Sequence, residues 1–61
     1  MKFYKYKIYG RENFIVLDKV VMVHMSKSTG WITLQGKDIP TEVDREIAEG
    51  LIKAMEEASG E

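Results

Sequence analysis

The sequence predicts an α+β domain in which a curled antiparallel sheet of four to five short strands is followed by one amphipathic helix. Up to Pro40, apolar residues alternate with polar ones or form short runs bounded by turn residues, a pattern typical of strands. After Pro40 the apolar residues recur every three to four positions, which is the period of a helix. The 61 residues are therefore expected to form a single small domain, residues 1–61, of marginal stability.

The first two strands are expected at residues 3–9 and 14–17, as an antiparallel pair. Side chains in "FYKYKIY" alternate between two faces. One face is apolar and aromatic, consists of Tyr4, Tyr6 and Ile8, and is expected to face the core. The opposite face is mixed, and carries Phe3, Lys5, Lys7 and Tyr9. Gly10, which accepts a positive φ, and the polar residues after it predict a turn before "FIVL".

Three further strands are expected at residues 20–26, 31–35 and 37–39. Asp18 and Lys19 interrupt the apolar run, so "VVMVHM" is a separate strand or the far side of a bulge, where a one-residue offset would exchange the two faces. "SKSTG" is expected to be a polar loop before "WITL". The dipeptide "QG" then predicts a tight turn that returns "KDI" as the last strand, and Pro40 ends this strand or lies on an edge.

The helix is expected over residues 42–58. Thr41 suits the N-cap position, and the carboxylates that follow it interact favourably with the positive end of the helix dipole. The apolar stripe consists of Val43, Ile47, Leu51, Met55 and Ala58. "SG" at residues 59–60 is the stop signal. A glycine inside a helix, such as Gly50, lowers helix stability by about 1 kcal/mol relative to alanine. Its presence indicates either that the helix backbone closely approaches the sheet at this point or that the cost is simply tolerated.

Charge is divided unevenly along the chain. Residues 1–37 carry seven basic and two acidic side chains, a balance of +5, whereas residues 38–61 carry two basic and eight acidic ones, a balance of −6. Such a chain can pair with itself or present two faces to different partners, although a lysine-rich sheet and a glutamate-rich helix also follow from propensity. The start "MKFYKYKIYG" has no continuous apolar run, so we expect no signal peptide, no membrane span and a cytoplasmic protein.

Few residues in the sequence suit catalysis, and we expect no enzyme, cofactor, metal site or small-molecule substrate. Without cysteine, disulfides and thiolate metal sites are excluded, and the single histidine, His24, cannot form a histidine cluster. Its apolar setting in "VMVHM" is typical of a structural histidine. "STG" and "QGK" contain too few glycines for a phosphate-binding loop, and the helix carboxylates are interpreted as a solvated face.

One helix covers only one face of a sheet, so apolar side chains on the other face are expected to meet a partner. The leading hypothesis is a non-catalytic protein-interaction or regulatory module that forms a homodimer. The alternative is a single-stranded nucleic-acid-binding protein, in which lysines follow phosphates and aromatic rings stack on bases; the acidic helix and the pI of 5.8 weigh against it. The candidate interaction surface consists of Lys5, Lys7, Tyr9, Arg11, Met22, His24 and Trp31.

The order "KYKIYGRENFIVLDKVVMVHM", a short polar loop, "WITLQGKDI" and an acidic amphipathic helix resembles the small flagellar FlbD family over nearly the whole chain. Similar small proteins are often carried by phages and mobile elements. No invariant catalytic residue marks the family, so the resemblance implies this fold and a non-enzymatic accessory role. The chain departs from the family pattern at the dipeptide "QG", where the family has an Asn-Gly turn, at Pro40 and in the lysine–tyrosine strand.

Overall fold

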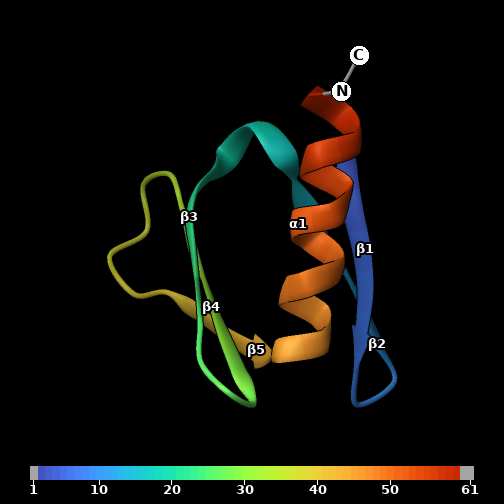
Figure 1. Ribbon diagram of the computed structural model, residues 1–61, viewed down its shortest axis with the longest axis vertical. Coiled ribbons are helices and arrows are strands. Elements are labelled where there is room, and N and C mark those ends of the chain that lie inside the picture. Colours follow the sequence, from blue (N-terminus) through green and yellow to red (C-terminus); the bar gives the residue numbers. More distant parts are fainter. Residues whose placement is uncertain (1, 60–61) are drawn as a thin grey trace.

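The computed structural model describes residues 2–59 and contains two antiparallel sheets and one helix (Figure 1). The elements, in order, are β1 (Phe3–Ile8), β2 (Arg11–Val16), the short 3-10 helix η1 (Leu17–Lys19), β3 (Val20–Met25), β4 (Thr29–Leu34), β5 (Thr41–Asp44) and α1 (Arg45–Ser59). The predicted α+β class, with short antiparallel strands and a C-terminal helix, is confirmed. The strands form a two-stranded sheet, β1-β2, and a three-stranded sheet, β3-β4-β5, instead of one curled sheet.

The β1-β2 hairpin is closed by a two-residue turn. Tyr9 and Gly10 have φ values of 52° and 77°, as the mirror-image turns of tight hairpins require. The predicted positive φ of Gly10 is confirmed, but the polar residues after it are not part of the turn. Because the turn is so short, β2 begins at Arg11, and residues 11–13 pair with residues 6–8. The observed β2 therefore begins three residues before the strand predicted at residues 14–17.

The predicted break at Asp18 and Lys19 is the short helix η1, which separates the two sheets (Figure 1). In β3 the pairing register shifts between Val20 and Met22, so a bulge lies at the start of this strand. The bulge places both Val20 and Val23 against the core although they are three residues apart. Without it, strict alternation would have turned one of these two valines to solvent.

The prediction for residues 37–44 is wrong in two respects. Residues 37–39 form no strand, because the chain turns at Gly36 and loops out until Pro40, leaving Ile39 exposed. The segment "TEVD", predicted as the helix start with Thr41 as its N-cap, is instead β5, which pairs with Thr29–Ile32 of β4. The helix therefore begins three residues later, at Arg45. Pairing with β4 outweighs the local preference of acidic residues for a first helical turn.

The core lies where α1 packs against both sheets (Figure 1). It consists of Ile15, Ile32, Val43, Ala48 and Leu51. Around these residues pack the inward side chains of the hairpin, which are Tyr4, Tyr6 and Ile8, as predicted. The helical stripe is confirmed from Ile47 to Met55, and the helix ends at Ser59; the predicted stop residue Gly60 lies outside the described residues.

Two glycines allow the helix to approach the sheets closely. A Cβ atom on Gly30 of β4 would overlap the Cβ of Ala48, and one on Gly50 of α1 would overlap the Tyr4 hydroxyl. The sequence left open whether Gly50 marks a close approach or is merely tolerated, and the structure shows a close approach. Gly30 has the same role on the sheet side, and nothing in the sequence pattern singled it out.

Tyr6 gives a testable pH dependence. Burial, and then the charge of the neighbouring Tyr4, raise the pKa of the Tyr6 hydroxyl above its ordinary value of 10.0. The unfolded chain therefore ionises first, so this contribution to stability is complete below about pH 10 and is lost as pH rises through the folded-state pKa. We expect Tyr6→Phe to lose less stability than wild type between about pH 9 and pH 11 in urea denaturation. Equal losses in the two proteins would contradict this explanation.

Candidate interaction surfaces

The three-stranded sheet presents its outer face to solvent, because α1 covers the inner one. We call this surface the sheet face, and it consists of Met22, His24, Trp31, Thr33, Glu42 and Asp44. The rings of His24 and Trp31 are in contact, with centroids 5.5 Å apart. Met22 is 57% exposed, and its neighbour Val21, at the bulge, is 67% exposed. A shallow hollow here is lined by Met22, His24, Trp31, Thr33 and Pro40.

The outer face of the β1-β2 hairpin is a second exposed surface. We call it the hairpin face, and it consists of Phe3, Lys5, Lys7, Glu12, Phe14 and Val16. Phe3 and Phe14 are 56% and 60% exposed and meet edge to face, with ring centroids 5.6 Å apart. Lys5 forms an exposed ion pair with Glu12, with 3.3 Å between Nζ and Oε2. This surface thus combines exposed aromatic rings with basic side chains.

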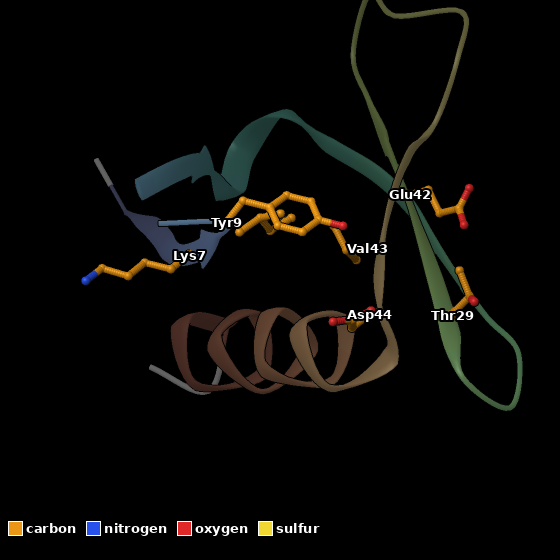
Figure 2. A pocket seen from close by; sticks show the side chains of 7 residues that line it. Lys7, Tyr9, Thr29, Glu42, Val43 and Asp44 are labelled. Carbon is orange, nitrogen blue, oxygen red and sulfur yellow. The ribbon is translucent and has the colours of Figure 1, made fainter. Parts of the chain in front are cut away.

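A hollow of about 390 Å³ separates the hairpin tip from β5 (Figure 2). Lys7 lies on the hairpin side of the hollow, and Glu42 and Asp44 lie on the other side. Figure 2 shows the Tyr9 ring directed toward Val43, whereas Lys7 and Glu42 extend in opposite directions. The hollow is open to solvent and polar, so it suits the edge of an interface better than an enclosed ligand site.

Tyr9 has an unusual position for an aromatic residue. It is 99% exposed and has a left-handed backbone conformation, which favours Gly, Asn or Asp in this kind of turn. A non-glycine residue in such a conformation costs on the order of 1–3 kcal/mol. The ring makes little contact within the chain to offset this cost, so Tyr9 is a candidate for contact with a partner.

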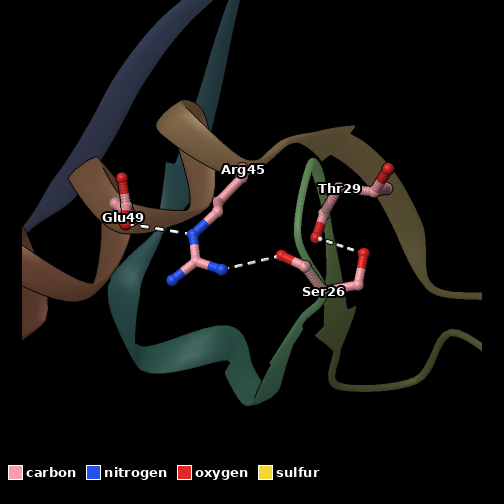
Figure 3. Close-up of polar contacts among 4 residues, drawn as sticks. All are labelled: Ser26, Thr29, Arg45 and Glu49. Atoms are coloured by element: carbon pink, nitrogen blue, oxygen red, sulfur yellow. Dashed lines mark hydrogen bonds and ion pairs between the residues drawn. The ribbon is translucent and has the colours of Figure 1, made fainter.

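Arg45 connects the start of α1 to the loop between β3 and β4 (Figure 3). Its Nη1 donates to the carbonyl oxygen of Ser26 at 2.8 Å, and its Nε donates to Oε2 of Glu49 at 3.1 Å. Its backbone N–H also donates to the carbonyl oxygen of Ser28 at 3.2 Å. These bonds fix the helix start beside β4, so the role of Arg45 is structural.

The structure divides the predicted surface residues into three groups. Met22, His24 and Trp31 lie together on the sheet face, and Lys5 and Lys7 lie on the hairpin face. Tyr9 is at the hairpin tip, and Arg11, at the start of β2, lines a third hollow with it. Sequence reasoning missed the other residues of the two faces, among them Phe14 on the hairpin face and Glu42 and Asp44 on the sheet face. The hairpin register would have identified Phe14, because it pairs with Lys5.

Within residues 2–59 we find no group of three or more histidine or acidic residues that could hold a metal ion. The helix in this part of the chain is not long and apolar enough to cross a membrane. Comparisons with protein-family models, curated proteins and solved structures gave no match. The resemblance to FlbD thus stays a prediction.

Proposed function

We propose that this chain is a non-catalytic protein-interaction module whose sheet face binds another protein in the cytoplasm. The observation that carries the proposal is the exposure of Met22 beside Trp31 and His24 on a sheet face that α1 does not cover. Exposed apolar clusters with a polar rim are typical of protein interfaces. Here the carboxylates of Glu42 and Asp44 form that rim.

The side chains of the sheet face suit protein contact in particular. Tryptophan and methionine are enriched at interfaces, the former as a rigid anchor and the latter as an adaptable contact. Trp31 lies on β4, the central strand, where the core of the sheet holds its backbone in place. Met22 lies on the edge strand β3. An anchor on a rigid strand beside an adaptable edge is the arrangement expected of a binding surface.

Single-stranded nucleic acid on the hairpin face is the second candidate. The exposure of Phe3 and Phe14 beside Lys5 favours it, because bases stack on exposed rings while lysines contact phosphates. Tyr4 and Tyr6 face the core, so they do not add to the aromatic surface on which bases could stack. Glu12 also neutralises part of the positive charge at Lys5. A protein partner therefore ranks first.

Site-specific photo-crosslinking in the source cell tests this proposal. A photoreactive amino acid replaces Met22 on the sheet face, and the matched control replaces Lys53, which is exposed on α1. We expect a protein adduct at position 22 that survives nuclease treatment, and none at position 53. Adding Trp31→Ser to the position 22 variant should abolish the adduct, because it removes the proposed anchor.

Two outcomes would contradict the proposal. Equal crosslinking at positions 22 and 53 would show that the sheet face is not a preferred contact. Loss of all captured protein on nuclease treatment would show that nucleic acid mediates the association, which would favour the second candidate.

A further inference from the structure

We propose that the sheet face takes the hairpin face of a second copy of this chain, so that copies associate head to tail. This inference depends on the proposed function, since it names the partner of the sheet face. It is carried by two rows of opposite charge with the same spacing and by two apolar surfaces that lie beside them.

The first row is basic and the second is acidic. Lys5 and Lys7 are two residues apart on one face of β1, and Glu12, which pairs with Lys7 and forms an ion pair with Lys5, reduces the net charge of this row to +1. Glu42 and Asp44 are two residues apart on one face of β5, on either side of the buried Val43. Residues two apart on a strand lie about 7 Å apart, so the two rows have the same repeat. Each lysine of one copy can therefore meet a carboxylate of the next.

The aromatic residues lie in matching positions beside the two charged rows. Phe14 on β2 is paired with Lys5, and Trp31 on β4 is paired with Glu42. In both sheets the aromatic strand lies one strand spacing, about 4.8 Å, from the charged one. Placing the lysine row of one copy over the carboxylate row of another can therefore also place β2 over β4. The aromatic residues of the two copies are then buried together.

The acidic helix does not offer the same match. Its exposed side is charged, but the large exposed apolar residues of the described chain lie on the strands, the hairpin tip and the loop before β5. A basic aromatic surface docked on α1 would leave Phe3 and Phe14 without apolar contacts. The sheet face matches the hairpin face in both charge and apolar character.

The direction of the two surfaces determines the kind of assembly. Figure 2 shows the Lys7 and Glu42 side chains extending in opposite directions. Because the contact uses different surfaces on the two partners, each copy keeps one surface for a further neighbour. Growth then continues into an open chain or stops at a closed ring. The homodimer expected from the sequence is thereby extended to a larger assembly.

A charge-swap experiment tests the inference. Lys5→Glu/Lys7→Glu gives an acidic hairpin face, and Glu42→Lys/Asp44→Lys gives a basic sheet face. In each variant alone the two surfaces have like charge, so self-association should weaken by more than about a hundredfold. In an equimolar mixture every contact again joins opposite charges. Sedimentation should therefore show monomers in each separate sample and assemblies larger than a dimer in the mixture.

Two controls change the net charge equally elsewhere. Lys19→Glu/Lys53→Glu matches the hairpin variant and Glu56→Lys/Glu57→Lys matches the sheet variant, at exposed positions outside both surfaces. Both controls should assemble as wild type does. Circular dichroism establishes that each variant is folded. Since a variant can fail to fold, the wild type is also measured at rising salt, where screening of exposed charges should weaken its association.

The outcomes separate this inference from the proposed function. A wild type that stays monomeric up to millimolar concentration, or variants that assemble as wild type does, would overturn the inference. The inference would also be overturned if Lys5→Glu/Lys7→Glu lost oligonucleotide binding while its self-association stayed unchanged. In these cases a nuclease-resistant adduct at position 22 to a different protein would still support the proposed function. Adducts between copies of this chain, together with renewed assembly in the mixture of the two charge-swapped variants, would support both the inference and the proposed function.

Discussion

Leu51→Ala should destabilise the protein by about 2–5 kcal/mol, because it removes buried methyl groups and leaves a cavity. Leu51 is fully buried in α1 and belongs to the core that joins the helix to both sheets. A domain of this size has a total stability of about 3–9 kcal/mol at the usual 0.05–0.15 kcal/mol per residue. The variant should therefore be largely unfolded or melt far below wild type in thermal and urea denaturation.

The matched control is Lys53→Ala, two residues further along α1 at an exposed position. It keeps a good helix former and removes no buried surface, so its melting temperature should stay close to that of wild type. If Leu51→Ala also melted close to wild type, α1 would not pack on the sheets as described, and the assignment of an uncovered outer face would fail with it.

Gly30→Ala should be the most destabilising single-methyl addition in the sheet. The new Cβ would overlap the Cβ of Ala48, so α1 and β4 would have to move apart. Overpacking of a well-packed core costs about 1–3 kcal/mol, and here the obstruction is close to the helix backbone. Urea denaturation of the variant should show a midpoint well below that of wild type.

A double-mutant cycle identifies the cause of this loss. Ala48→Gly removes the methyl group that Gly30→Ala would meet, at a helix-propensity cost of about 1 kcal/mol. If steric overlap is the cause, the double variant should be more stable than the sum of the two single changes predicts, by about 0.5–3 kcal/mol. Strictly additive effects would show that the loss at Gly30 has another origin.

The parts of the fold with strong local periodicity were predictable from the sequence. The alternation in β1 correctly placed Tyr4 and Tyr6 inside, and the helical stripe correctly placed Leu51. Both patterns reflect one element packing against a single apolar layer, so they are visible in a short window of residues. The break at Asp18 was visible for the same reason, because it interrupts such a pattern.

Features that depend on distant pairing were not predictable. The segment "TEVD" suits a first helical turn locally, and its place in β5 depends on hydrogen bonds to β4. The separation into two sheets depends on how η1 turns the chain between β2 and β3. A short window of sequence does not indicate the direction of this turn. The short hairpin turn was missed because Tyr9 is an unusual residue for its backbone conformation.

The same distinction holds for the surfaces. Lys5, Lys7 and Trp31 were identifiable because each belongs to a strand whose phase the sequence indicates. The face of Met22 was left open, because a bulge at the start of β3 exchanges the two faces of that strand. Glu42 and Asp44 were assigned to a helix, so their position beside Trp31 on the sheet face could not be anticipated. The match between the two charged rows therefore appears only once β5 is paired with β4.

The central claim is that partners cover the sheet face, and the fluorescence of Trp31 tests it most directly. Trp31 is the only tryptophan in the chain and lies on the sheet face. The measurement is acrylamide quenching of the wild type across a concentration series in which sedimentation detects association. We expect quenching to decrease and emission to shift to shorter wavelength as copies associate, because the ring becomes shielded from water. Association that leaves both the quenching and the emission of Trp31 unchanged would contradict the claim.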